Sequence, residues 1–205
     1  MLALNRRYLG KHFHLAVSLF ALLLFACDPV QSEEPEAESP EPSMFWSMEE
    51  LIEYDGPMMG DAYYALGVKY SSGWGVPEDD RLAVEWYRKA ADAANTSAMF
   101  NLGVAYDNGV GVPVDDRLAV EWYRKAADAG NANAMYNLGI MYAEGRGVPQ
   151  NDVEAYVWSS LSTAFGESKA AHNRDVLRDR LSSDAVMEAQ RRASVLFDEI
   201  SGRVR

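Results

Sequence analysis

The stretch from Asp79 to Ala93 reads DDRLAVEWYRKAADA, and the same letters stand again from Asp115 to Ala129. A changed copy of this stretch follows from Asn151 to Phe165. The residues that recur 36 positions apart around these copies are Leu66, Leu102 and Leu138; Gly67, Gly103 and Gly139; Tyr70, Tyr106 and Tyr142; Pro77, Pro113 and Pro149; and Trp86, Trp122 and Trp158. A fixed period of this length is typical of a solenoid, in which each unit covers the apolar face of its neighbour. The sequence therefore predicts a tandem array of three units.

The first helix of each unit is predicted from an apolar stripe and the glycine that ends it. In the second unit, Met99, Leu102 and Tyr106 recur at helical spacing over about 97–108. A glycine follows the stripe where a left-handed cap is needed, and a second glycine and a proline come soon after. The capping glycines of the three units are Gly73, Gly109 and Gly145.

The second helix of each unit is expected to begin at an Asp or Asn, whose side chain can accept hydrogen bonds from the free amide groups of the first turn. In the first unit, Ala83, Trp86 and Ala90 then share one face of this helix. The predicted N-cap residues are Asp79, Asp115 and Asn151. The fold class that follows is all-α, a right-handed α-solenoid of three 36-residue helical hairpins with terminal capping helices.

One glycine stands inside each first helix, where it costs roughly 1 kcal/mol relative to alanine. A residue that weakens the helix at every repeat needs a structural reason. We assign Gly67, Gly103 and Gly139 to close contact between the two helices of a hairpin. The rings expected to pack over these glycines are those of Trp86, Trp122 and Trp158.

The repeated pattern A-x-x-x-L-G-x-x-Y-x-x-G-x-G-V-P-x-D-x-x-x-A-x-x-W-Y-x-x-A-A resembles the SEL-one-like repeat (SLR) family, which is related to the tetratricopeptide repeat and has a longer period. The resemblance covers residues 60–166, divided into units 60–95, 96–131 and 132–166. The third unit departs from the pattern at Ser159, where the first two units carry a tyrosine.

The segments that flank the array are expected to cap it. Residues 48–59 are predicted to contain an N-terminal capping helix. In residues 167–205, the run from Asn173 to Asp175 and the later pair Ala189 and Gln190 resemble the closing helices of SLR proteins, which cover the last repeat.

Residues 1–26 are predicted to be an export signal. Basic residues precede an apolar run of 14 residues from Phe13 to Ala26, and a membrane-spanning helix needs roughly 20. Cys27, the only cysteine, follows directly in the sequence LFAC, which resembles the lipobox of bacterial lipoproteins, where the cysteine is acylated. The expected location is the periplasmic face of the inner or outer membrane, with attachment through the lipid.

The charge of the chain argues against several kinds of partner. Residues 27–47 contain acids and prolines but no Lys or Arg, and we predict a disordered acidic tether there. The net charge is −12, and removal of Arg6, Arg7 and Lys11 with the signal would change it to −15. Such a chain is a poor ligand for nucleic acid and for anionic lipid surfaces.

The residues needed for catalysis or metal binding are scarce. His12 and His14 would leave with the signal, His172 would remain alone, and Cys27 would carry lipid. Zinc sites and nucleophile–histidine pairs therefore lack their parts. Acidic pairs such as those at Asp79 and Asp115 are assigned to helix capping. The sequence predicts no enzyme activity, no cofactor and no metal.

Partner contacts are expected on the first helices, at positions that vary between units, because core positions must repeat and ligand-facing positions need not. The predicted contact residues, opposite the Leu/Tyr stripe and lining a concave groove, are Lys69, Asn101, Ala105, Asn108, Asn137, Met141 and Glu144. Resemblance to tetratricopeptide proteins implies that the asparagines hydrogen-bond a peptide backbone. The alternative is that Asn101 and Asn137 satisfy carbonyl groups of the adjacent repeat. Tyr64, Phe100 and Tyr136 are expected in the core between helices.

These features predict a non-catalytic envelope adaptor, a monomeric repeat domain that binds a protein or peptide partner carrying basic segments. Two alternatives stay open. One is a regulatory subunit or enzyme of cell-wall glycan metabolism, which would need two acids on the groove, where the sequence places only Glu144. The other is a structural lipoprotein that associates with itself.

Overall fold

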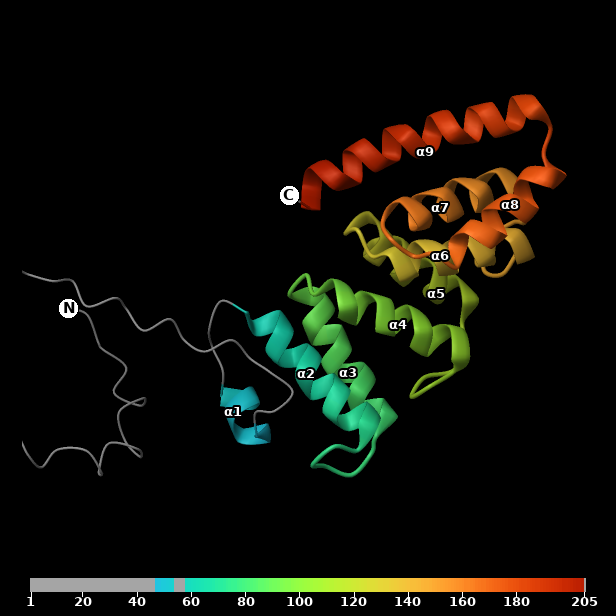
Figure 1. Ribbon diagram of the computed structural model, residues 1–205. Helices are drawn as coiled ribbons and strands as arrows, with labels where there is room; N and C mark the ends of the chain where they lie inside the picture. The colour runs from blue at the N-terminus through green and yellow to red at the C-terminus, as the bar shows by residue number, and fades with distance from the viewer. Residues whose placement is uncertain (1–46, 54–57, 205) are drawn as a thin grey trace, which may run out of the picture. The chain divides into compact units, whose positions relative to one another are not determined.

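The computed structural model describes residues 47–53 and 58–204. The predicted signal, Cys27 and nearly all of the predicted tether lie outside the described residues. All described helices belong to one compact unit, and every regular element in these two ranges is helical, which confirms the all-α prediction (Figure 1). None of the helices within 47–53 and 58–204 combines the length and the apolar character that a membrane crossing requires.

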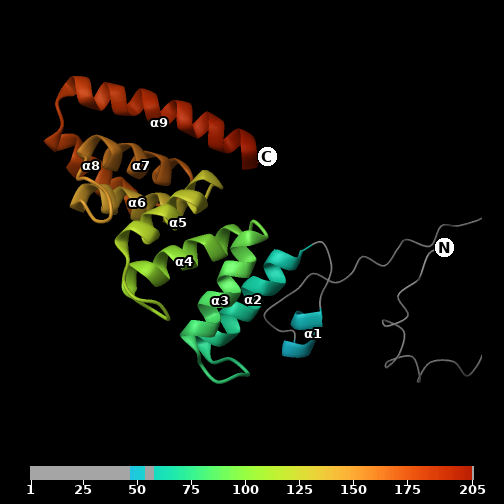
Figure 2. The same ribbon diagram turned by 180° about the vertical axis from the view of Figure 1, so that it is seen from behind.

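Six of the described helices form three successive hairpins, seen from opposite sides in Figure 1 and Figure 2. The first helices of the hairpins are α2 (Met59–Ser72), α4 (Thr96–Asn108) and α6 (Ala132–Glu144), and the second helices are α3 (Asp80–Asp92), α5 (Asp116–Asp128) and α7 (Asp152–Ala164). The flanking helices are α1 (Met48–Glu53), α8 (Ala170–Arg180) and α9 (Ser183–Val204). Each hairpin also packs on the next, because the second helix of one contacts the first helix of the following one.

The helix ends follow the predicted chemistry. Gly73, Gly109 and Gly145 cap the first helices in the left-handed conformation, with φ of 66°, 72° and 70°. At the start of α3, Asp79 Oδ1 accepts hydrogen bonds from the amides of the residues two and three positions later, both at 3.0 Å. The N-caps of α5 and α7 make the same pair of bonds. Both ends of every hairpin loop are thus fixed by local residues.

The glycine inside the first helix lies against a tyrosine in the first two hairpins and against Ser159 in the third, so the prediction that a tryptophan covers it is wrong. A Cβ added at Gly67 would lie 2.5 Å from Cδ1 of Tyr87. At Gly103 it would lie 2.4 Å from Cδ1 of Tyr123. Adjacent residues of a helix point about 100° apart, so only one member of the Trp-Tyr pair can face the glycine. The role assigned to the glycines, close contact within the hairpin, is correct.

The tryptophans instead pack toward the preceding element. The ring of Trp86 lies 5.8 Å from that of Tyr63 and packs on the small core formed by α1 and α2. Trp122 packs on the core between the first two hairpins. Both rings are half-buried, and Lys89 and Lys125 place their Nζ atoms 3.8 and 3.9 Å from the two ring centroids. The tryptophans therefore help to join successive units.

The third hairpin differs in its second helix, α7. Ser159 occupies the position of the tyrosines, and its Oγ would lie 2.8 Å from a Cβ added at Gly139. Trp158 is buried, with 1% of its surface exposed. Neither Trp158 Nε1 nor Ser159 Oγ has a hydrogen-bond partner among the described residues. Among the described residues, the buried polar side-chain atoms without a hydrogen-bond partner thus all lie in the last hairpin.

Helix α8 corresponds to the first helix of a fourth unit. Ala170, Asn173 and Leu177 stand 36 positions after Ala134, Asn137 and Met141. Ala170 and Leu177 are buried like their counterparts, with 0% and 3% of their surface exposed. This side of α8 packs on α7, as α4 packs on α3.

The other side of α8 has lost the repeat pattern. The 36-residue period places Arg174, Asp175 and Arg178 at the positions where the earlier first helices carry Leu, Gly and Tyr. Asp175 pairs with both arginines, at 3.1 and 3.2 Å. In a complete unit the Leu, Gly and Tyr would face the second helix of the same hairpin. Because α9 packs on α7 instead, α8 ends the array as half a unit.

Helix α9 closes the last hairpin. Arg192 on α9 pairs with Glu154 on α7 at 2.5 Å. Beyond the end of α7, the ring of Phe165 lies 5.2 Å from that of Phe197. Figure 1 and Figure 2 both show α9 alongside α7.

Candidate partner-binding face

Each first helix carries an aromatic residue and a β-branched residue four positions later, on the side that its neighbours leave partly open. All six side chains are half-buried, so each shows part of its apolar surface to solvent. We call this set the first-helix face, and it consists of Tyr64, Val68, Phe100, Val104, Tyr136 and Ile140. The 36-residue period places equivalent members on successive hairpins.

Three of the predicted contact residues are buried, so the prediction that they line an open groove is wrong. Lys69, Ala105 and Met141 have only 7%, 5% and 1% of their surface exposed. Each stands seven positions after a buried alanine, as Ala105 does after Ala98, and residues seven apart share a side of a helix. That side packs on the preceding element and cannot line an open surface. Asn108 and Glu144 are exposed, and their part in binding stays a prediction.

The asparagines are engaged inside the array. The Asn101 side chain acts to lower the pKa of Tyr87 in the preceding hairpin, and Asn137 acts in the same way on the pKa of Tyr123, so each asparagine lies near a tyrosine hydroxyl. This supports the structural alternative for both asparagines, although their partners are tyrosine hydroxyls and not the predicted carbonyl groups. Burial raises the pKa of the Tyr87 phenol, while its hydrogen bond with Ser71 and the nearby Asn101 side chain oppose that rise.

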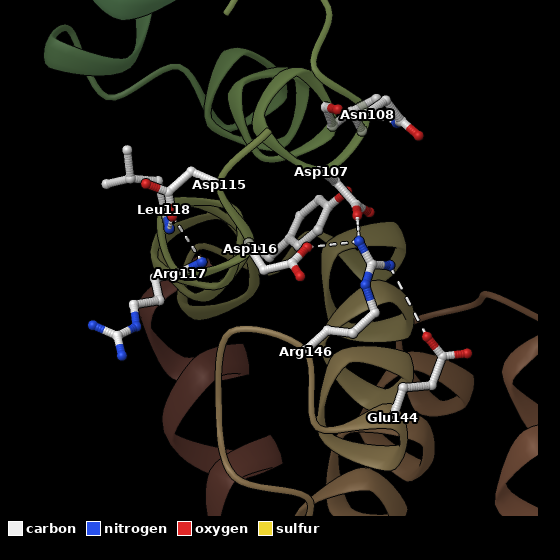
Figure 3. A network of polar contacts seen from close by, with 10 residues as sticks. Asp107, Asn108, Asp115, Asp116, Arg117, Leu118, Glu144 and Arg146 are labelled. Atoms are coloured by element: carbon white, nitrogen blue, oxygen red, sulfur yellow. Dashed lines mark hydrogen bonds and ion pairs between the residues drawn. The ribbon is translucent and has the colours of Figure 1, made fainter. Parts of the chain in front are cut away.

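A charge cluster joins the second and third hairpins, and sequence reasoning missed it (Figure 3). Arg146, in the loop after α6, reaches back to Asp107 on α4 and to Asp116 on α5, the latter at 2.7 Å. Its Nη1 also lies 4.0 Å from Oε2 of Glu144. The hydrogen bond to Asp107 raises the pKa of the Arg146 guanidinium. The corresponding loops of the first two hairpins carry Trp and Val at this position, and that difference was the available signal.

The same cluster holds Tyr123. Its hydroxyl donates to Asp107 Oδ2 at 3.1 Å. Burial, followed by the negative charge of Asp107, raises the pKa of Tyr123 well above its ordinary value. The neutral phenol is therefore the form that this joint requires.

In the second and third hairpins, the second glycine of the loop lies against the backbone of the preceding hairpin. A Cβ added at Gly111 would lie 2.2 Å from the carbonyl oxygen of Asp80. At Gly147 it would lie 2.2 Å from the carbonyl oxygen of Asp116. Gly75 has nearly the same φ, 74° against 71° and 67°, but no described residue comes within 4 Å of its added Cβ. Hence Gly111 and Gly147 are contact residues, and Gly75 shares only their conformation.

The polar residues of this region have structural partners. Asp107, Asp116 and Glu144 all reach the same cation, Arg146. In the part of the chain that the structure describes, no three His, Cys, Asp or Glu residues come together to hold a metal. The face offers apolar contact more than reactive groups.

Comparison with known proteins agrees with this architecture. The family model for the Sel1 repeat matches residues 60–95, 96–131 and 132–163. The crystal structure of a Sel1 repeat protein from Oxalobacter formigenes is 33% identical, with a TM-score of 0.62, and the match covers 64% of this chain and 54% of that one. A protective antigen of uropathogenic Escherichia coli strains that displays an SLR fold is 25% identical, with a TM-score of 0.59.

The match to the Escherichia coli antigen covers 71% of this chain and 39% of the antigen, so the chain spans only part of each solved relative. No curated protein matches the chain significantly. Sel1 repeats generally build helical scaffolds for protein–protein interaction, without catalysis of their own. On its three matched repeats, the chain belongs to the Sel1 repeat family.

Proposed function

We propose that this protein is a non-catalytic adaptor of the cell envelope, which binds an extended segment of a protein partner along the first-helix face. The observation that carries the proposal is the ladder of six half-buried apolar side chains on successive hairpins. A monomer would gain stability by burying them further, and exposed apolar surface that forms a continuous patch is a common mark of an interaction site.

The repeat supports an extended partner over a compact one. The aromatic and β-branched residues of the face are flanked along their helices by the polar residues Ser97, Asn108 and Glu144, which are exposed. An extended segment can match such a ladder with its own alternating side chains, while its backbone bonds to polar groups between them. The anchors of this interface would be Phe100 and Tyr136, because aromatic residues dominate the energy of protein interfaces.

The charge of the chain favours a partner with basic residues. The net charge is −12, and acidic residues such as Glu85 and Glu121 are exposed on the second helices. Such a field would attract a basic segment over several ångströms and would increase the rate of association. Binding should therefore weaken as salt is added, since the Debye length falls to about 8 Å at physiological ionic strength.

Attachment to the envelope is the part of the proposal that rests on sequence alone. The apolar run that ends at Ala26 and the LFAC sequence at Cys27 favour a lipid anchor. A partner attached to the same membrane would then meet the adaptor at a high effective concentration. Growth with labelled palmitate should label the wild type and not Cys27→Ser. Equal labelling of both would refute the lipid anchor without touching the binding face.

Photocrosslinking in living cells tests the binding face. A benzoylphenylalanine in place of Tyr136 keeps an aromatic ring on the face, and the same residue in place of the exposed Glu121 serves as the matched control on a second helix. We expect a discrete crosslinked partner from position 136 and none from position 121. Crosslinks to the same protein from both positions, or only to a second copy of this chain from position 136, would contradict the adaptor proposal.

A further inference from the structure

We infer that α8 extends the first-helix face by one further step, and that the partner segment places an apolar side chain against Ile140 and Val176 beside a basic side chain facing Glu144. This inference rests on the proposed function, because it names the chemistry of the partner at the same face. It follows from the incomplete fourth unit, from the packing of the third hairpin and from the charges at its edge.

The repeat period continues onto α8. His172 and Val176 stand 36 positions after Tyr136 and Ile140, so they occupy the face positions of a fourth first helix. His172 is exposed, and Val176 has 39% of its surface exposed. Because Ala170 and Leu177 are buried against the array as their counterparts are, α8 has the orientation that the ladder requires.

The face residues of the third hairpin pack less on the core than those of the first two hairpins. Tyr64 and Phe100 tilt against the rings of Tyr87 and Tyr123, with centroid distances of 5.9 and 6.0 Å. In the third hairpin Ser159 stands at that position, so Tyr136 has no such ring behind it.

The core clusters likewise show that the face residues of the third hairpin contribute less to the core. Phe100 and Val104 pack on the buried core, whereas Tyr136 and Ile140 do not belong to any core cluster of the described residues. The apolar surface of the last hairpin and of α8 is therefore the part of the face most available to a partner.

Charge selects the residue that accompanies the apolar side chain. The Glu144 side chain is 56% exposed, and its nearest cation, Arg146, lies 4.0 Å away and is also bound by Asp107 and Asp116. Glu144 thus keeps negative charge for a partner. Arg180, at the next step of the ladder, is exposed, so a basic side chain of the partner should lie toward Glu144 and away from the end of α8.

The test begins with the purified chain and a phage-displayed library of random 12-residue peptides. Selection should enrich peptides that carry an aliphatic or aromatic residue next to Lys or Arg. Enrichment of acidic peptides would overturn the inference, and failure to enrich any peptide would overturn the proposed function as well.

The affinity of the enriched peptide is then measured for three variants. Val176→Glu tests α8, Asn108→Arg tests the middle of the face at an exposed position, and Met187→Glu is the control, because Met187 is an apolar residue of α9 with 60% exposure. We expect losses of about tenfold or more for the first two, equivalent to about 1.4 kcal/mol, and less than twofold for the control.

The pattern of losses separates the two claims. If Asn108→Arg weakens binding and Val176→Glu does not, α8 is not part of the face and the inference fails, while the proposed function stands. If Val176→Glu alone weakens binding, α8 is a separate site and the extension is wrong. Unchanged affinity in both would refute the face itself. A helical circular dichroism spectrum like that of the wild type confirms that each variant is folded.

Discussion

The two joints of the array use identical second-helix sequences but different contacts. At the first joint, between the first two hairpins, the Tyr87 hydroxyl hydrogen-bonds Ser71 of its own hairpin, and the loop after α4 presents Val110, which is 43% exposed. At the second joint, the equivalent positions are Asp107 and Arg146, which bind each other, and Asp107 also accepts a hydrogen bond from Tyr123. Two repeats can therefore share an identical second helix while residues at the end of the first helix and in the loop decide whether a joint is neutral or charged.

The largest expected effect comes from what the two joints share. Gly111→Ala and Gly147→Ala would each push a Cβ into a carbonyl oxygen of the preceding hairpin, and we expect a loss of stability on the order of 3 kcal/mol. Gly75→Ala has the same backbone strain without the clash, and should cost about 1 kcal/mol. Urea unfolding of the three variants measures this. Equal losses at all three glycines would mean that the joints are not close-packed.

The next largest effect comes from the charge cluster around Arg146, which distinguishes the second joint from the first. Arg146→Val gives the second joint the loop residue of the first and leaves Asp107 and Asp116 without their cation, at a cost of about 1.5 kcal/mol in low salt. Adding Asp107→Ser, also taken from the first joint, should restore part of that loss. The double-mutant cycle is measured by urea unfolding at low and high salt. Additive losses that do not change with salt would show that the cluster contributes nothing.

Alkaline pH should weaken the second joint through Tyr123, whose pKa lies above its ordinary value of 10.0. In the unfolded chain the phenol ionises near that value, whereas the folded state keeps it neutral. The contribution of Tyr123 is therefore complete below about pH 10 and decreases as pH rises above it.

Tyr123→Phe isolates this contribution. The variant should lose about 1 kcal/mol at pH 8, where the hydrogen bond to Asp107 is removed, and its stability should fall less steeply between pH 9 and 11. The unfolding free energy of both proteins across this range checks it. Parallel pH profiles would argue that Tyr123 is not held neutral.

The smallest expected effect concerns Ser159, which stands in the third hairpin where the first two carry a tyrosine. Ser159 Oγ is buried without a hydrogen-bond partner among the described residues, so Ser159→Ala removes an unsatisfied hydroxyl. We expect stability to be unchanged or to increase by about 0.5 kcal/mol. Thermal unfolding is sufficient to test this. A loss of more than about 1 kcal/mol would show that the hydroxyl has a partner.

The sequence predicted those features that depend on a few neighbouring residues. Gly109 and Asp115 set the ends of helices through their own backbone conformation or side chain, so the pattern revealed them directly. The sequence did not reveal whether Trp or Tyr packs over the helical glycine, because the two residues are adjacent and both recur with the same period. Only the relative rotation of the packed helices decides which of them lies over Gly103.

The contact surface was predicted poorly because variation between repeats was equated with exposure. Lys69, Ala105 and Met141 differ greatly in size and charge, yet all are buried. Lys69 fits because its long side chain reaches Trp74, with Nζ 4.6 Å from the ring centroid. The link from Arg146 to Asp107 joins residues far apart in sequence, and no local pattern indicates such a contact.

Ordered photocrosslinking along the first helices tests the central claim most directly. Benzoylphenylalanine is placed in turn at positions 64, 100, 136 and 172, with positions 85 and 121 on the second helices as controls, and the crosslinked peptides are identified by mass spectrometry. We predict that the four face positions capture successive residues of one segment of one partner, in order along its sequence. Crosslinks from positions 85 and 121 to that segment, or no order among the four, would contradict the account.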